Sequence, residues 1–127
     1  GTGVIGLTLA KGAEKVIGLE IVAAAVEDAK KNAELNKISN AEYLVGKAEE
    51  TIHEAIKLAG RSSEVVAIVD PPRAGLHPRV LRELRNCASI SKLIYVSCNM
   101  KSMVEDLKKL VQPPSKKFSG AAFVATR

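Results

Sequence analysis

The sequence is poor in aromatic residues and cysteines, and it has no long apolar run. Aromatic residues make up 3% of its 127 residues and tryptophan is absent, so a platform of stacked rings for single-stranded nucleic acid is not expected. Two cysteines are too few for a disulfide framework, which favours a reducing compartment. No apolar run approaches the ~20 residues of a membrane span, and no basic-then-apolar leader follows Gly1. We therefore expect no membrane partner and an intracellular location, in the cytoplasm or nucleus, with the mitochondrion left open.

Acidic residues are missing from the end of the sequence. The chain has 19 Lys and Arg against 14 Asp and Glu, a net charge of +5. Residues 1–106 hold 14 of each sign, so the whole excess lies in residues 107–127. The cations there are Lys108, Lys109, Lys116, Lys117 and Arg127. Such an end could attract nucleic-acid phosphates, or it could be a solvated end without a ligand.

Short apolar segments alternate with longer helical patterns. We expect strands at 15–20, 42–46, 65–70 and 92–97, and helices at 4–10, 22–36, 49–59, 79–87 and 101–111. This alternation predicts an α/β fold in one domain, with a doubly wound, mostly parallel sheet. Ligands of such folds bind at the carboxyl ends of the strands.

A glycine string opens the sequence. Gly1-Thr2-Gly3-Val4-Ile5-Gly6 matches G-x-G-x-x-G, whose glycines make a tight turn, allow a ligand to approach and let the next helix pack on the sheet. Glu20 lies 19 residues after Gly1, at a strand end where a carboxylate can accept both ribose hydroxyls of an adenosine ligand. The pair predicts an adenosine cofactor, either a dinucleotide or S-adenosylmethionine; the alternative is a structural turn and a solvated Glu20. The turn needs a strand before Gly1, so we expect the chain to be truncated there.

A proline pair follows the most apolar expected strand. Asp70 ends that strand, and Pro71 and Pro72 fix φ and remove backbone donors. This predicts a rigid loop at the ligand edge, where Asp70 could orient a substrate or cofactor group; the alternative is a plain strand-ending turn. Arg73 stands where an aromatic residue would indicate methylation of a base amino group, so that chemistry is disfavoured.

The two cysteines differ in their expected surroundings. Cys98, in Ser97-Cys98-Asn99, lies between a strand end and a helix start, where a thiolate is stabilised. We therefore assign Cys98 as a nucleophile in preference to a core residue. Cys87 lies in an apolar helical stretch and is interpreted as a small core residue. No His or Cys cluster has metal-ligand spacing, so no metal site is expected.

Three arginines recur at every third position of the expected helix at 79–87. Arg79, Arg82 and Arg85 could meet RNA phosphates from one helix face, or they could form a solvated face. His77 precedes this helix and could touch a substrate, although a plain loop residue is the favoured interpretation.

Together these motifs resemble RNA 5-methyluridine (uracil-C5) methyltransferases of the TrmA type. The resemblance rests on GTGVIGL at 1–7, the strand ending in Glu20, DPPRAGLHP at 70–78 and YVSCN at 95–99. It implies a Rossmann-like, class I S-adenosylmethionine-dependent methyltransferase fold, truncated at both ends, in which residues 1–127 form part of the catalytic domain. It also implies an RNA substrate, with tRNA ahead of ribosomal RNA. No obligate protein partner is inferred.

The resemblance implies a role for each motif. Residues at the strand ends would line the cofactor site: Gly1, Gly3, Glu20, Glu49 and Asp70. Residues of two loops would face the substrate: Pro71, Pro72, Arg73 and Asn99. Cys98 would add to C6 of uracil, which makes C5 nucleophilic toward the methyl group.

The sequence departs from the family pattern in two places. Met100 stands where members usually have proline, which concerns the helix start more than the chemistry. The family places a glutamate general base beyond the last helix, whereas no Asp or Glu follows Asp106 here. We therefore expect this chain alone to be inactive.

Two other functions fit parts of the pattern. An NAD-dependent oxidoreductase could use the same glycine turn and Glu20, but it leaves the Asp70 and Cys98 motifs unexplained. A non-catalytic RNA-binding module could use the basic end, and its RNA binding would not depend on Cys98.

Overall fold

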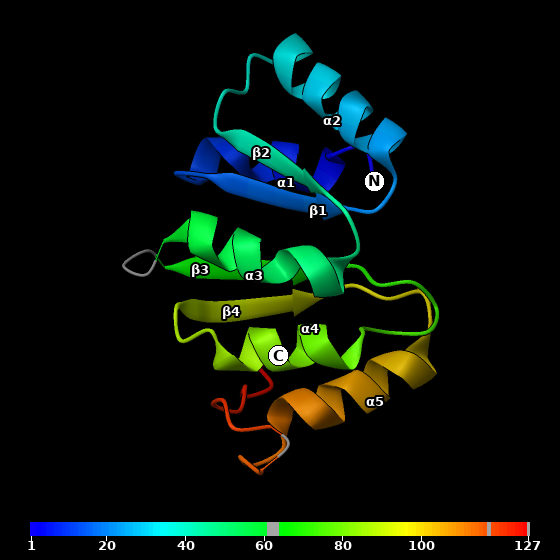
Figure 1. Cartoon of the computed structure of the whole chain (residues 1–127), viewed down its shortest axis with the longest axis vertical. Helices are drawn as coiled ribbons and strands as arrows, with labels where there is room; N and C mark the ends of the chain where they lie inside the picture. The colour runs from blue at the N-terminus through cyan, green and yellow to red at the C-terminus, as the bar shows by residue number, and fades with distance from the viewer. Residues whose placement is uncertain (61–63, 117, 127) are drawn as a thin grey trace. The chain divides into compact units, whose positions relative to one another are not determined.

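The computed structural model describes residues 1–60, 64–116 and 118–126. The chain divides into two compact units, residues 1–60 and 61–127. In the described ranges each unit contains one pair of parallel strands together with its helices (Figure 1).

The first unit places a parallel strand pair among three α-helices. Its elements are α1 (Val4–Leu9), a short 3-10 helix (Ala10–Gly12), β1 (Val16–Glu20), α2 (Ala23–Leu35), β2 (Ala41–Val45) and α3 (Ala48–Ala59). The strands pair from Val16 opposite Ala41 to Glu20 opposite Val45. Helix α2 joins the strands and packs against both, while α1 and α3 also pack against β1.

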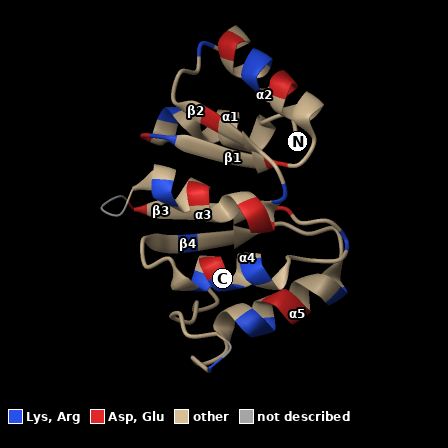
Figure 2. Cartoon of the chain, viewed as in Figure 1, with Lys and Arg blue, Asp and Glu red and all other residues tan. Residues whose placement is uncertain are grey.

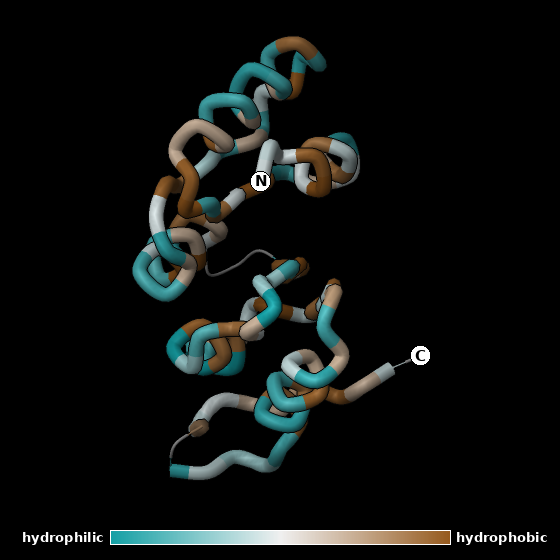
Figure 3. The backbone as a smooth tube through the Cα atoms, turned by 90° about the vertical axis from the view of Figure 1, so that its right-hand side faces the viewer, coloured by the Kyte–Doolittle hydropathy of each residue, from teal (hydrophilic) through white to brown (hydrophobic). Residues whose placement is uncertain are grey.

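Small side chains let these helices approach the strands. The buried residues of α2 are Val26, Ala29 and Ala33, whose spacing marks one face of a helix. Gly6 of α1 has the packing role that its motif predicts, because a Cβ there would lie 2.8 Å from Cγ1 of Val16 in β1. Figure 3 shows the helices alternating between hydrophilic and hydrophobic residues along their turns.

The second unit repeats the strand–helix–strand order. Its elements are β3 (Val65–Val69), α4 (Pro78–Asn86), β4 (Ile90–Tyr95) and α5 (Met100–Val111). The pairing of β3 with β4 has an irregularity at Val65, where Ser91 is an extra residue on β4. The Ser91 hydroxyl donates to the Glu64 carboxylate at 2.9 Å. The strand therefore begins at Ile90 rather than at Lys92 as predicted, and it ends at Tyr95, which leaves Ser97 in the following loop.

The core of this unit gathers α4, α5 and the chain end. Leu81, Leu110 and Phe118 are buried together, and partly buried residues pack against them: Leu76, Leu93, Tyr95, Leu107 and Phe123. Pro78 occupies the first turn of α4, where its missing N–H has no cost. Met100 is the first residue of α5, so the helix starts beside Asn99 without a proline.

The expectation of one exposed row of arginines is wrong for Arg85. This residue is 3% exposed, because it follows buried Leu81 by four positions on α4. Its guanidinium donates to the carbonyl oxygens of Lys109, Gly120 and Ala121 at 2.8, 2.7 and 3.3 Å and lies 5.6 Å from the Phe118 ring centroid. Arg79 and Arg82 are exposed.

The basic end is partly neutralised by neighbouring acids. Lys108 lies 2.8 Å from the Glu105 carboxylate, and Lys109 lies 3.6 Å from that of Asp106, both one turn apart on α5. Figure 2 shows charges of both signs on this helix. Lys116 is exposed, while Lys117 and Arg127 lie outside the described residues.

The α/β class and its alternating order of elements are confirmed. The described strands form two separate two-stranded sheets, so one doubly wound sheet stays a prediction. No helix in the described part of the chain is long and apolar enough to cross a membrane.

Candidate functional site

The carboxyl end of β1 brings Glu20 to the glycine turn. The backbone nitrogen of Gly1 lies beside the Glu20 carboxylate, and the Val22 N–H donates to Oε1 of Glu20 at 2.8 Å. The structure therefore joins two of the residues predicted to bind the cofactor, although they are 19 positions apart in sequence.

Gly3 has a conformation and surroundings that exclude a side chain. Its φ is +85°, and an added Cβ would lie 2.6 Å from Oη of Tyr43 and 3.0 Å from Cβ of Ala29. The turn is thus pressed onto β2 and α2, a packing requirement that the motif alone did not predict. Burial raises the pKa of Tyr43, and its buried hydroxyl has no hydrogen-bond partner among the described residues.

Glu49 lies at the start of α3. It is a half-buried residue in the first turn of that helix, after the carboxyl end of β2. A surface depression in the same unit lies instead at the amino ends of β1 and β2, where Lys15 and Glu42 form an exposed ion pair. The predicted cofactor residues Gly1, Glu20 and Glu49 thus all follow or face the carboxyl ends.

The loop of residues 70–77 leaves the carboxyl end of β3. Asp70 is exposed directly after the strand, Pro71 is buried and Pro72 is exposed. The Gly75 N–H donates to the Pro72 carbonyl oxygen at 2.9 Å, with Gly75 at a φ of +85°. The loop ends at His77, whose Nδ1 accepts from the Arg79 N–H at 3.2 Å. His77 is therefore the N-cap of α4, a local role that favours the plain interpretation over substrate contact.

Cys98 lies exposed in the loop between β4 and α5. Its neighbours are fixed: the Ser97 hydroxyl accepts from the Asn99 N–H at 3.0 Å, and Oδ1 of Asn99 accepts from the Lys101 N–H at 3.1 Å to cap α5. Cys98 thus has the helix-start position predicted for a nucleophile. Cys87 is half-buried at the end of α4 rather than inside the helix.

Asn99 connects the two loops of this unit. Its Nδ2 donates to the Arg73 carbonyl oxygen at 2.8 Å, which places the proline loop beside the Cys98 loop. The contact is possible because both strands end at the same edge, where the Val96 N–H donates to the Val69 carbonyl at 2.8 Å. Two residues predicted to face the substrate, Arg73 and Asn99, are therefore brought together.

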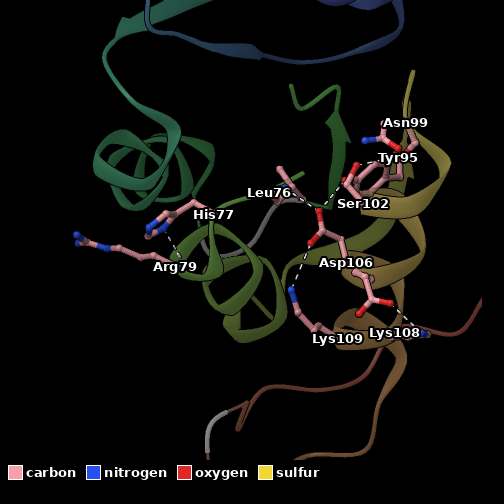
Figure 4. Close-up of polar contacts among 10 residues, drawn as sticks. Leu76, His77, Arg79, Tyr95, Asn99, Ser102, Asp106, Lys108 and Lys109 are labelled. Carbon is pink, nitrogen blue, oxygen red and sulfur yellow. Dashed lines mark hydrogen bonds and ion pairs between the residues drawn. The ribbon is translucent and has the colours of Figure 1, made fainter. Parts of the chain in front are cut away.

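Sequence reasoning missed the buried carboxylate behind these loops. Asp106 of α5 accepts hydrogen bonds on Oδ2 from the Leu76 N–H at 2.6 Å and from the Tyr95 hydroxyl at 2.7 Å (Figure 4). Burial, then the bond to Asp106, raises the pKa of Tyr95. The available signal was position: Asp106 is four residues before buried Leu110, on the inner face of its helix.

The groups at the carboxyl end of β1 suit an adenosine-type ligand. The Glu20 carboxylate accepts from the Val22 N–H through Oε1, which leaves its other oxygen able to accept a ribose hydroxyl. The unpartnered Tyr43 hydroxyl lies under the same turn. Among the described residues, no three His, Cys, Asp or Glu side chains gather as metal ligands would.

Comparison with known proteins gives one consistent family. Residues 1–123 match the family model described as tRNA (uracil-5-)-methyltransferase. Similar proteins include the human tRNA (uracil-5-)-methyltransferase homolog A, 42% identical over 123 residues, which cover 97% of this chain and 20% of the relative. The zebrafish (Danio rerio) homolog B is 48% identical over 98 residues, covering 77% and 20%. An uncharacterized RNA methyltransferase of Clostridium tetani is 45% identical over 112 residues, covering 88% and 23%.

These relatives are much longer than the chain. It spans about a fifth to a quarter of the length of the relatives it matches, from 20% to 26%. The candidate site residues at the carboxyl ends of the strands, in both units, fall inside the matched residues 1–123.

Proposed function

Because the chain belongs to the tRNA (uracil-5-)-methyltransferase family, we propose that the protein containing it transfers a methyl group from S-adenosylmethionine to C5 of a uridine in RNA. A tRNA is the proposed substrate, since the family description and the relatives' names specify it. The observation that carries the proposal is the exposed Cys98 beside the proline loop, with Asn99 joining the two loops. We also propose an intracellular site of action, in the cytoplasm or nucleus, with the mitochondrion open.

Cys98 supplies the nucleophile in this proposal. Uracil C5 is a poor nucleophile, and addition of the Cys98 thiolate to C6 converts the ring to an enolate that is nucleophilic at C5. After methylation a base removes the C5 proton, and elimination breaks the bond between Cys98 and C6. A target base inside a helix must leave its stack to reach the thiol.

The residues around Cys98 have positioning roles in this proposal. Pro71 and Pro72 make the loop after β3 rigid, and Asn99 holds the Arg73 backbone of that loop beside the loop that carries Cys98. The proposed role of Asp70 is to orient a cofactor or substrate group, because it lies exposed at the end of β3.

The cofactor residues of the proposal are those of the first unit. Gly1 and Gly3 form the turn, Glu20 accepts the ribose hydroxyls, and Glu49 contributes to the adenine pocket. When bound, S-adenosylmethionine supplies the methyl group as a sulfonium electrophile. For the fold, we propose that the two parallel pairs are parts of one doubly wound sheet of the class I methyltransferase type.

Product analysis tests the function directly. The full-length protein is incubated with S-adenosylmethionine and unmodified tRNA, and the digested nucleosides are analysed by mass spectrometry. We expect 5-methyluridine at one position and no product with NAD in place of S-adenosylmethionine. NAD-dependent oxidation of a substrate would support the oxidoreductase, and tRNA binding without methylation would support the binding module; either result contradicts the proposal.

A further inference from the structure

Asp106 is a buried acid that ties three segments of the second unit together. It is 3% exposed and lies on α5. The Tyr95 hydroxyl from β4 and the Leu76 N–H from the proline loop both donate to its Oδ2, at 2.7 and 2.6 Å. Its Oδ1 lies 3.6 Å from Nζ of Lys109. Figure 4 shows the carboxylate between Leu76 and the tyrosine.

The backbone of the proline loop leaves room for the Asp106 carboxylate at Gly75. A Cβ on Gly75 would lie 2.6 Å from Oδ2 of Asp106 and 3.2 Å from Cβ of Ser102. Glycine at this position therefore lets the loop backbone reach the acid, and its positive φ makes the turn onto Pro72. The loop is held at two places, by Asn99 at Arg73 and by Asp106 at Leu76.

We propose that Asp106 is a positioning residue of the methyl-transfer site, because its buried carboxylate fixes the Pro71-Pro72-Arg73 loop relative to the loop that carries Cys98. The inference rests on the proposed function and adds a residue to its site. Asp106 itself touches neither substrate nor cofactor in this scheme. It acts through the Leu76 backbone, and Tyr95 keeps its carboxylate oriented.

Charge and geometry make the carboxylate hard to replace. Hydrogen bonds to an ionised acceptor are about twice as strong as neutral ones. The side-chain amide of an Asp106→Asn variant keeps one oxygen that can accept from Leu76 and Tyr95, but it loses the charge that strengthens both bonds, and its donating nitrogen would face Lys109. A shift of about 1 Å in a reacting group can slow a reaction by about 100-fold.

The test uses the full-length protein and tRNA that contains 5-fluorouridine. Fluorine at C5 cannot leave as a proton, so the adduct on Cys98 accumulates after methyl transfer and its rate can be followed by denaturing electrophoresis. We expect Asp106→Asn to slow adduct formation about 10- to 100-fold at saturating RNA, with S-adenosylhomocysteine affinity changed less than twofold. Tyr95→Phe, which keeps the carboxylate and its bond to Leu76, should slow it less.

A neighbouring acid provides the matched control. Glu105→Gln removes a carboxylate from the same helix, but Glu105 is exposed and pairs only one turn away with Lys108, so the adduct rate should stay at the wild-type value. Amide hydrogen exchange of residues 73–77 should be faster in Asp106→Asn and unchanged in Glu105→Gln.

The outcomes separate this inference from the proposed function. If the wild-type protein forms no adduct, the proposed function fails and the inference fails with it. If the wild type reacts and folded Asp106→Asn reacts equally fast, only the inference is overturned, even when the variant unfolds at a lower temperature. If Asp106→Asn does not fold, Tyr95→Phe decides, and an unchanged adduct rate in that variant overturns the inference.

Discussion

The carboxyl edges of the two units are built by different means. In the first unit the chain turns at Gly3, whose missing side chain lets the turn pack onto Tyr43 and Ala29. In the second unit a longer loop, residues 70–77, is held by the side chains of Asn99 and of Asp106 in α5. The carboxyl edge of the first unit therefore depends on the missing side chain of Gly3, and that of the second unit depends on the buried carboxylate of Asp106.

This difference determines which substitutions each edge tolerates. The first edge should be sensitive to added volume and the second to lost charge. The groups with proposed chemistry differ as well. Cys98 is exposed, so it can be replaced with little disturbance of the surrounding structure, whereas the Glu20 side chain is 18% exposed and accepts from the Val22 N–H.

The largest effect should come from Cys98. In the full-length protein, Cys98→Ala should abolish both turnover and the covalent adduct with 5-fluorouridine tRNA, because in the proposed mechanism no other atom forms the bond to C6. Mass spectrometry of the trapped peptide checks the site. Cys87→Ala is the internal control and should keep both activities, with at most a small packing cost. An adduct on Cys87, or full turnover by Cys98→Ala, would contradict the mechanism.

Gly3→Ala should cause the largest loss of stability at the first edge. A side chain at a φ of +85° costs about 1–3 kcal/mol, and overpacking against Tyr43 adds about 1–3 kcal/mol. Denaturant unfolding of the full-length protein measures the loss. Tyr43→Phe removes the hydroxyl that lies 2.6 Å from the added Cβ, so the double variant should recover part of it.

Gly12 provides the comparison for that experiment. A Cβ on Gly12 would meet no atom within 4 Å, and its φ is outside the positive range. Gly12→Ala should therefore be nearly neutral. Equal losses at Gly3 and Gly12 would show that the first edge does not depend on the close packing of its turn.

In the full-length protein, Glu20→Ala should weaken the binding of the cofactor. Loss of a hydrogen-bonded charged group costs about 1.5–3 kcal/mol in affinity, which calorimetry with S-adenosylhomocysteine measures. Glu27→Ala removes an exposed acid from α2 that pairs with Lys30, and it should leave the affinity unchanged. Unchanged affinity in Glu20→Ala would remove this residue from the site.

The smallest effect concerns pH and Tyr95. Burial, with the bond to Asp106, raises the pKa of Tyr95 above its ordinary value, which is about 10. The folded state therefore favours the neutral phenol, so its contribution to stability is complete below pH about 10 and is lost as the pH rises further. Tyr95→Phe should cost about 1 kcal/mol at neutral pH and flatten the decline above pH about 10 in denaturant unfolding. A decline as steep as in the wild type would contradict this assignment.

The local fold follows from the sequence to a large extent. Apolar runs, Pro78 and Gly60 give all four predicted strands and the helices between them to within two residues. The start of β4 was misplaced because polar Ser91 interrupts the apolar pattern and is accommodated as an extra residue. Pattern analysis cannot detect such an irregularity, since it depends on the partner strand.

The positions of the candidate site residues were predictable where they depend on local sequence. Glu20 at a strand end and Cys98 before a helix follow from local sequence, and both lie where expected. Asp106 was missed because its function depends on Leu76 and Tyr95, which are 30 and 11 positions away. Arg85 was misjudged for the same reason, because its partners lie up to 36 positions further along the chain.

Arg85 makes residues 118–123 part of one cooperative unit with α4 and α5. Its guanidinium binds carbonyl oxygens of α5 and of residues 120 and 121 at the same time, and the Phe123 N–H donates to the Leu110 carbonyl at 3.0 Å. Detachment of residues 118–123 would take two carbonyl acceptors from a permanently charged group and leave the Leu110 carbonyl of α5 without its donor. The segment should therefore open together with α4 and α5 in a single subglobal event.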